Sequence, residues 1–169
     1  MIKVFLVEDE VVMRNGIKNN IPWEKEGLIF AGEASDGELA YPMIKKAQPD
    51  ILITDIRMPF MDGLELSELV KKEFPKIKII ILSGYNEFDY AKQAIHIGVT
   101  DYLLKPITAS KLLEAVKKVA DVIEKEREEE GMLERYRLEM AENTVLERQR
   151  LFRDLVTSRI NFKEALERG

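Results

Sequence analysis

Short apolar runs alternate with longer stretches of helical periodicity over the first 121 residues. Runs of four to seven residues rich in β-branched or aromatic side chains predict strands buried within a sheet. These runs are residues 3–7, 28–34, 51–54, 78–82 and 101–104. After each run, apolar residues recur at intervals typical of helices, which we expect within residues 10–21, 36–48, 62–74, 87–98 and 108–126. This alternation predicts an α/β fold, a flavodoxin-like doubly wound parallel sheet covered by helices on both faces.

Several of the predicted helices carry further local signals. Pro42 is expected to distort or shorten the first turns of the second helix, and Gly98 to end the fourth. The fifth helix follows a capping residue, Thr108 or Ser110. The third helix has an apolar stripe formed by Leu64, Leu66, Leu69 and Val70. The fifth has one formed by Leu112, Leu113, Val116, Val119 and Ile123.

The pattern changes after residue 121, so we expect one domain over 1–121 and a helical extension over 122–169. The extension holds ten Lys or Arg and twelve Asp or Glu residues, with no proline and no strand-like run. Its apolar residues repeat at coiled-coil spacing in two registers that disagree. One register consists of Leu133, Tyr136 and Met140, and the other of Leu138, Val145 and Phe152.

We interpret 132–158 as an amphipathic helix that needs a partner surface, with a free-standing coiled coil as the alternative. The charged block 124–130 is either a solvated helix face or a flexible joint. We expect a break at Gly131 and another helix that starts near residue 158. A solvated face is expected to hold Arg148, Arg150, Arg153 and Arg159.

The composition narrows the class of protein only a little. With 46% hydrophobic residues among 169 the chain can build a core, and its net charge of −5 argues weakly against a nucleic-acid surface. It has no cysteine, which fits a reducing compartment. The N-terminus lacks the pattern of a signal peptide, and no segment approaches the roughly 18 apolar residues of a membrane helix. We therefore expect a cytoplasmic protein without a membrane anchor.

Polar side chains follow four of the predicted strands. Glu8 and Asp9 follow the first strand, Asp55 the third, Ser83 the fourth and Lys105 the fifth. Because ligands bind beyond the carboxyl ends of parallel strands, we expect these five side chains to converge on one rim. Three clustered carboxylates repel one another, so some would be protonated unless a cation joins them.

The residue types at this rim favour phosphoryl chemistry. Oxygen ligands without a nearby histidine or cysteine suit Mg²⁺, which binds one or two carboxylates together with water and phosphate oxygens. An aspartate beside Mg²⁺ can attack a phosphoryl group and form an acyl phosphate. Lys105 would neutralise the charge on the transferred group, and Ser83 could donate a hydrogen bond to one of its oxygens.

Four separated motifs, "VEDE", "DIRMPFMDG", "LSGY" and "DYLLKP", resemble the signature of the response-regulator receiver domain of two-component signalling. The resemblance covers residues 1 to about 121 and implies the strand order 2-1-3-4-5. It implies that Asp55 is the phosphoacceptor, that Glu8 and Asp9 serve Mg²⁺, and that Arg57 supplies a backbone carbonyl to the metal. Glu8 departs from the commoner aspartate of the family.

The resemblance also assigns a switch. Ser83 stands at the family's Ser/Thr switch position, Tyr102 at its switch aromatic and Lys105 at its invariant lysine. The Lys105–Pro106 peptide is expected to be cis, as is common in the family. Phosphorylation by a sensor histidine kinase would draw Ser83 inward, admit the ring of Tyr102 and change the face formed by the fourth helix, fifth strand and fifth helix. We expect a homodimer through that face, the tail helix or both.

Two segments, "IPWEKEG" and "SGYNEFDYAKQAI", resemble the subgroup of receivers that regulate AraC-type helix-turn-helix output domains. No helix-turn-helix pattern follows within 122–169, and this tail is net acidic. We therefore expect a chain cut before its DNA-binding domain, with no nucleic-acid contact through these residues.

Other interpretations of the same residues stay open at this point. Asp55 alone could be a strand-end acid, Ser83 a turn former, Lys105 a loop lysine and Tyr102 ordinary packing. A Mg²⁺-dependent aspartyl phosphohydrolase would share the nucleophile, but it needs a general acid two residues later, where this chain has Arg57. A receiver-like interaction module that works without phosphorylation is a third hypothesis. His96 is expected to be neither ligand nor catalyst.

Overall fold

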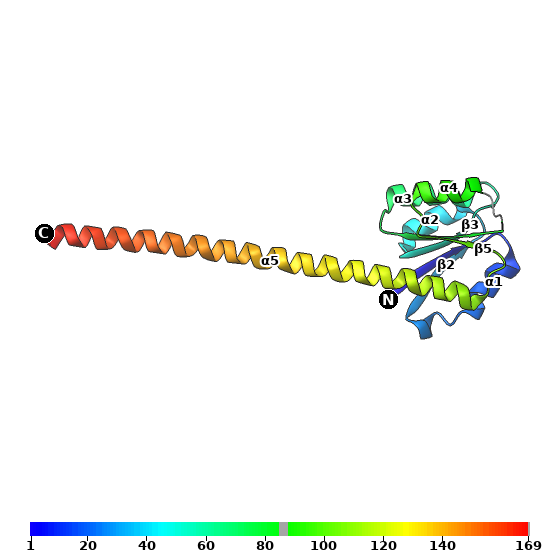
Figure 1. The fold of residues 1–169 in the computed structure, drawn as a ribbon, viewed down its shortest axis with the longest axis horizontal. Coiled ribbons are helices and arrows are strands. Elements are labelled where there is room, and N and C mark those ends of the chain that lie inside the picture. The colour runs from blue at the N-terminus through cyan, green and yellow to red at the C-terminus, as the bar shows by residue number, and fades with distance from the viewer. Residues whose placement is uncertain (85–87, 169) are drawn as a thin grey trace. The chain divides into compact units, whose positions relative to one another are not determined.

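The computed structural model describes residues 1–84 and 88–168, and its elements alternate along the chain as expected (Figure 1). Residues 85–87, which include the first residue of the expected fourth helix, lie outside the described residues. The strands are β1 (Ile2–Val7), β2 (Leu28–Ala34), β3 (Ile51–Asp55), β4 (Lys78–Ser83) and β5 (Asp101–Leu104). The helices are α1 (Val11–Asn20), η1 (Glu24–Glu26, a 3₁₀ turn), α2 (Gly37–Ala47), α3 (Gly63–Glu73), α4 (Phe88–Ile97) and α5 (Ala109–Arg168).

The described strands form one parallel sheet in the order β2-β1-β3-β4-β5, which confirms the expected order 2-1-3-4-5. Ile53 of β3 pairs with Leu6 of β1 on one side and with Ile80 of β4 on the other. Because the strands are parallel, the carboxyl ends of β1, β3, β4 and β5 meet at one edge. The predicted fold class is confirmed.

Two apolar layers enclose the sheet, because successive side chains of a strand point to opposite faces. Val4 and Ile53 lie in the layer formed with α1 and the first turns of α5, where Leu112, Val116, Val119 and Ile123 are buried as expected. Phe5 and Leu52 lie in the opposite layer, formed with α2, α3 and α4. Figure 1 shows α3 and α4 on one side of the sheet and α1 on the other.

The buried face of α3 differs from the expected stripe at one residue. Leu64, Leu66 and Val70 are buried, but Leu69 is 38% exposed. The fourth inward position belongs to Ser67, which satisfies its hydroxyl by donating to the Gly63 carbonyl oxygen at 2.6 Å. The buried face of α3 therefore includes a small hydrogen-bonded serine, which the pattern of apolar residues does not predict.

The other local signals have mixed outcomes. Gly98 follows the last residue of α4, adopts a positive φ of 92° and donates to the Ala94 carbonyl, which is the helix stop that we expected. The helix α2 begins at Gly37, capped by the Asp36 side chain, and continues on both sides of Pro42, so Pro42 does not shorten its first turns. The Thr108 hydroxyl accepts from the Lys111 backbone N–H at 3.2 Å, which identifies the cap of α5 as Thr108.

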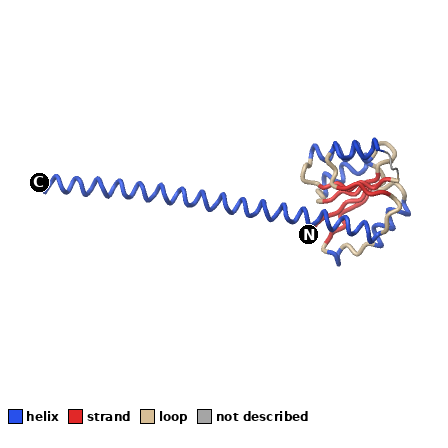
Figure 2. The backbone as a smooth tube through the Cα atoms, in the orientation of Figure 1, coloured by secondary structure: helices blue, strands red, loops and turns tan. Residues whose placement is uncertain are grey.

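The chain comprises two compact units, Met1–Ile123 and Glu124–Gly169. The second unit is helical throughout its described residues, since α5 continues to Arg168 (Figure 2). The expected break at Gly131 and the expected separate helix near residue 158 are therefore wrong. Glycine costs a helix only about 1 kcal/mol relative to alanine, and the Glu, Arg, Met and Leu residues on both sides of Gly131 favour helix. Among the described residues, no helix is both long and apolar enough to cross a membrane.

Candidate functional site

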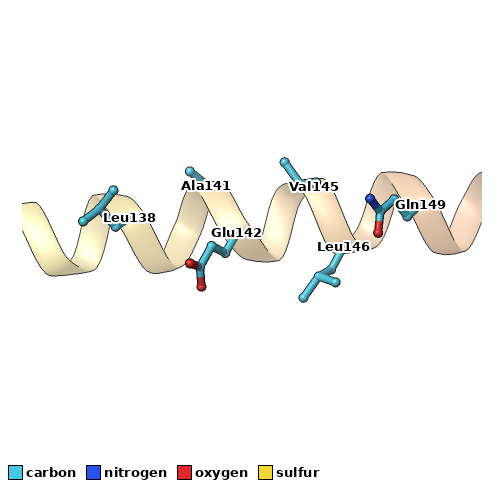
Figure 3. A pocket seen from close by; sticks show the side chains of 6 residues that line it. All are labelled: Leu138, Ala141, Glu142, Val145, Leu146 and Gln149. Carbon is cyan, nitrogen blue, oxygen red and sulfur yellow. The ribbon is translucent and has the colours of Figure 1, made fainter.

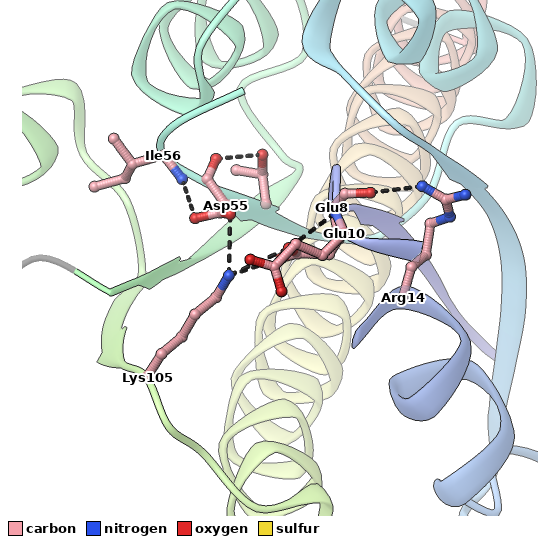
Figure 4. Close-up of polar contacts among 7 residues, drawn as sticks. Glu8, Glu10, Arg14, Asp55, Ile56 and Lys105 are labelled. Carbon is pink, nitrogen blue, oxygen red and sulfur yellow. Dashed lines mark hydrogen bonds and ion pairs between the residues drawn. The ribbon is translucent and has the colours of Figure 1, made fainter. Parts of the chain in front are cut away.

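The polar residues of the sequence motifs meet at the carboxyl edge of the sheet. Asp55 ends β3 and pairs in register with Leu82 of β4, so that Ser83 follows beside it. Glu8 follows β1, and its backbone N–H donates to the Ala34 carbonyl at the end of β2. The backbone N–H of Lys105 donates to the Ser83 carbonyl at 2.7 Å, which extends the β4–β5 pairing by one residue. Figure 4 shows the side chains of Glu8, Asp55 and Lys105 directed toward one another at this edge.

Lys105 connects the two buried carboxylates of the site. Its Nζ lies 3.0 Å from Asp55 Oδ2 and 3.1 Å from Glu8 Oε2. The other oxygen of Asp55, Oδ1, accepts the Ile56 backbone N–H at 2.8 Å. The Lys105–Pro106 peptide is cis, as the resemblance implied. Asp55 is therefore held from both sides, with one oxygen toward the end of its own strand and the other toward the lysine.

Burial governs the protonation of this cluster. Desolvation, followed by the charge of Asp55, raises the pKa of Glu8 to about 7, although Lys105 opposes the shift. Desolvation likewise raises the pKa of Asp55 above its ordinary value, against the hydrogen bond from Lys105. Burial alone would lower the pKa of Lys105, but its contacts with Asp55 and Glu8 outweigh burial and raise it. The contacts with Lys105 therefore do not fully offset the effect of burial on the pKa values of Glu8 and Asp55.

A third carboxylate completes a group that could hold a cation. Carboxylate oxygens of Glu8, Asp9 and Asp55 lie within 4.8 Å of one another, and Asp9 is the exposed member. Every ligand atom in this group is a carboxylate oxygen, which suits a hard divalent cation such as Mg²⁺. Burial, and after it the charge of Asp55, raises the pKa of Glu8, and a bound cation would favour the ionised carboxylate. The residues present therefore fit Mg²⁺.

Arg14 and Gly63, to which the sequence analysis gave no role, fix the backbone at Glu8 and at Asp55. Arg14 Nη1 donates to the Glu8 backbone carbonyl at 2.8 Å and ties α1 to the end of β1. Gly63 donates its backbone N–H to the Ile56 carbonyl at 2.7 Å. A Cβ on Gly63 would overlap the carbonyl oxygen of Asp55, so only glycine fits at this approach. The glycine is visible in the "DG" motif, whereas a single arginine in a helix gives no recognisable signal.

The remaining predicted residues lie around this centre. Ser83 is fully buried at the end of β4, and Tyr102 of β5 is half-buried in the apolar layer that contains Met58 and Met61. The side chain of Arg57 is exposed and donates to the Tyr90 hydroxyl of α4 from Nε at 3.3 Å and from Nη2 at 3.1 Å. His96, in α4, is exposed and lies outside the acidic group.

Comparison with known proteins identifies the family. Residues 4–117 match the family model described as the response regulator receiver domain. This chain belongs to that family. Receiver domains of two-component systems partner with histidine kinases and bind Mg²⁺ at an acidic pocket.

Individual relatives point the same way. The chain is 41% identical over 119 residues to the uncharacterized transcriptional regulatory protein YesN of Bacillus subtilis. The aligned residues cover 70% of this chain and 32% of YesN. It is 39% identical to the REC domain of AraT, a response regulator from Geobacillus stearothermophilus, with a TM-score of 0.69 and coverage of 74% and 97% of the two chains. A two component transcriptional regulator AraC from Clostridium phytofermentans is 31% identical, with a TM-score of 0.66 and coverage of 75% and 98%.

These comparisons confirm the expected family and its association with transcriptional regulators, including an AraC-type regulator. The chain spans between 32% and 50% of the length of the curated relatives YesN of Bacillus subtilis and DegU of Brevibacillus brevis. Its likeness to them is therefore a likeness to their receiver parts.

Proposed function

We propose that Asp55 is the phosphoacceptor of this receiver and takes its phosphoryl group from a sensor histidine kinase. The observation that carries the proposal is the position of Lys105, whose Nζ lies 3.0 Å from Asp55 Oδ2 and 3.1 Å from Glu8 Oε2. Asp55 is buried at a strand end and has its pKa raised by desolvation, which makes its carboxylate more basic than an exposed one. A basic carboxylate beside a fixed cation is suited to attack phosphorus.

The metal part of the proposal assigns Mg²⁺ to the side chains of Glu8, Asp9 and Asp55 and to the backbone carbonyl of Arg57. When bound, Mg²⁺ supplies positive charge that offsets the negative charge of the transferring phosphoryl oxygens. The donor set supports this assignment because three carboxylates lie within 4.8 Å of one another. Glu8 has a longer side chain than the commoner aspartate and occupies a fully buried position.

In the proposed transfer, one carboxylate oxygen of Asp55 attacks the phosphorus of the kinase phosphohistidine. The new O–P bond forms as the P–N bond breaks, and the electron pair of that bond stays on the imidazole nitrogen. Lys105, already bound to Asp55, stays beside the phosphoryl oxygens and stabilises their charge. Hydrolysis of the acyl phosphate by water later restores Asp55. Because both steps change a residue of this chain, the protein is a regulator rather than an enzyme acting on a separate substrate.

The proposed response starts at Ser83 and ends at a surface. The Ser83 hydroxyl would donate to a phosphoryl oxygen, and the accompanying movement would admit the ring of Tyr102. Tyr102 lies on β5, next to the face formed by α4, β5 and the start of α5. Phe88 and Ile95 of α4 are 80% and 78% exposed, so this helix carries apolar side chains that a dimer could bury. A homodimer through this face, the tail helix or both is part of the proposal.

The proposed role of the whole protein is transcriptional control. In this proposal residues 1–121 are the receiver and residues 122–169 link it to a DNA-binding output domain. The support is that the matched relative YesN is named as a transcriptional regulatory protein and is covered over 32% of its length. The residues of this chain would make no nucleic-acid contact themselves.

Incubation with acetyl phosphate and Mg²⁺, read by intact-mass spectrometry, tests the proposal. The parent chain should gain the mass of one phosphoryl group, and the gain should disappear in Asp55→Ala and in the presence of excess chelator. Asp50→Asn is the matched control, because Asp50 precedes the same strand at the opposite edge of the sheet, where it accepts the Lys3 N–H at 2.8 Å. Equal labelling of the parent and Asp55→Ala would exclude Asp55 as the phosphoacceptor.

A further inference from the structure

The second unit, Glu124–Gly169, presents a helix whose large apolar side chains are exposed to solvent. A row of large apolar side chains on an isolated helix indicates a surface that another helix or domain covers. The exposed apolar residues of the described part are Met132, Leu133, Tyr136, Leu138, Met140, Val145, Leu146, Leu151, Phe152, Leu155, Val156 and Leu166. The question is which of these side chains share a face and what covers it.

One set keeps the alternating spacing of three and four residues over 18 positions of the sequence. This seam consists of Leu138, Ala141, Val145, Arg148, Phe152 and Leu155. Figure 3 shows Ala141 and Val145 on the same side of the helix, with Leu146 directed away from them. Leu138, Ala141 and Val145 line a shallow hollow on the helix surface, which Glu142, Leu146 and Gln149 also line. The seam has the periodicity that packs side chains of one helix between those of a second.

The side chains that flank the seam indicate what the second helix is. The seam contributes two residues to each seven-residue repeat, and the first of the two is Leu138, Val145 or Phe152. In a parallel coiled coil, the residue just before each of these first positions faces the residue five places later in the partner. Arg137 then faces Glu142 of an identical chain. The next two pairs are Thr144 with Gln149 and Leu151 with Val156. Every pair matches in charge or polarity, although each residue comes from the same sequence.

We propose that the seam over 138–155 packs against the same seam of a second copy of this chain, parallel and in register. The charges favour this occupant because a parallel copy in register places its Glu142 opposite Arg137 of the first chain, and its Arg137 opposite Glu142. The inference deepens the proposed homodimer by naming its surface, and it does not require phosphorylation of Asp55. It leaves Leu133, Tyr136 and Met140 outside the seam.

Arg148 provides the sharpest test, because the sequence pattern alone placed it on a solvated face. In the proposed dimer it lies in the seam opposite the Arg148 of the other copy, and it lowers affinity while enforcing register. Arg148→Leu should tighten the dimer by about tenfold or more, measured by sedimentation equilibrium of the full chain. Arg150→Leu is the matched control, since Arg150 is an exposed arginine of the same helix on the outer side. An equal effect of both substitutions would overturn the proposed seam.

A charge exchange tests the direction of the partner helix. Arg137→Glu and Glu142→Arg should each weaken self-association by roughly 2- to 10-fold, because each places like charges opposite one another. An equimolar mixture of the two variants should regain the parent affinity, since the introduced glutamate of one chain would then face the introduced arginine of the other. A mixture no tighter than the separate variants would contradict the parallel register.

Further results of the sedimentation experiments also test the proposed seam. If the full chain stays monomeric at every concentration, or if Met140→Glu disrupts association while Val145→Glu does not, the seam does not join two copies. The same measurements on Asp55→Ala should give the parent affinity. That result separates the tail dimer from the proposed phosphorylation, because loss of labelling at Asp55 would leave sedimentation unchanged.

Discussion

At the scale of single residues, Glu8 is a buried carboxylate whose pKa is raised by desolvation. Its side chain is fully buried beside Asp55, and Lys105 is the cation in contact with both. An aspartate at the same place would reach less far toward Lys105. Because burial raises the pKa of Glu8 to about 7, its charge depends on pH in the range where the protein would operate.

The free energy of unfolding should show this titration. In the folded chain without metal Glu8 keeps a proton up to about pH 7, whereas in the unfolded chain it ionises near 4.5. The stability that this difference contributes is fully present below pH 4.5 and is lost as the pH rises through 7. Relative to Glu8→Gln, the parent should therefore lose on the order of 1–3 kcal/mol between about pH 5 and about pH 8.

Urea unfolding in excess chelator at the two pH values measures this difference. Glu38→Gln is a suitable control, because Glu38 is an exposed carboxylate in the first turn of α2. A gap between parent and Glu8→Gln that is the same at both pH values would mean that Glu8 is not protonated in the folded state.

At the scale of elements, the start of α3 is fixed against the end of β3. Asp62 caps α3 by accepting the Glu65 N–H at 2.8 Å, and Gly63 contacts the Asp55 backbone directly. The loop that follows Asp55 therefore has little freedom, and the proposed phosphoacceptor is positioned by a helix that contributes no reactive group. The sequence motif contains this glycine, but only packing explains why it is needed.

Gly63→Ala should destabilise the receiver unit by about 2 kcal/mol, because the new Cβ displaces the backbone at Asp55. Gly16→Ala is the matched control, since Gly16 lies inside α1 and its Cβ would meet only the end of Asn20 at 3.8 Å. That control should gain roughly 0.5–1 kcal/mol from helix propensity. Urea unfolding followed by the fluorescence of Trp23 measures both, and equal effects of the two substitutions would exclude the close approach as the cause.

At the scale of the whole molecule, the two apolar layers of the receiver lie entirely within Met1–Ile123. The last buried residue of α5 among those described is Ile123, and the described residues after it contribute nothing to either layer. The receiver therefore uses α5 only up to Ile123, whereas the proposed self-association uses residues 138–155 of the same helix.

A chain that ends after Glu126 should unfold with a free energy within about 1 kcal/mol of the parent, because no side chain described as buried is removed. The same truncation should abolish self-association in the absence of phosphorylation. Trp23, the one tryptophan of the sequence, is buried at the α1–β2 connection and reports unfolding of the receiver unit alone. Loss of several kcal/mol on truncation would show that the receiver depends on the tail.

The sequence by itself determined the strands through local apolar patterns and the family through four short motifs, and the resemblance to that family implied the strand order. Tertiary structure decided the features that depend on distant contacts. Lys105 meets Glu8 across 97 positions and Asp55 across 50, and only burial at their meeting point raises the pKa of Glu8. Likewise the packed face of α3 contains Ser67, whose hydroxyl donates to the Gly63 carbonyl, and leaves Leu69 38% exposed. The helix α5 continues through Gly131 because the helix-favouring residues on both sides outweigh one glycine.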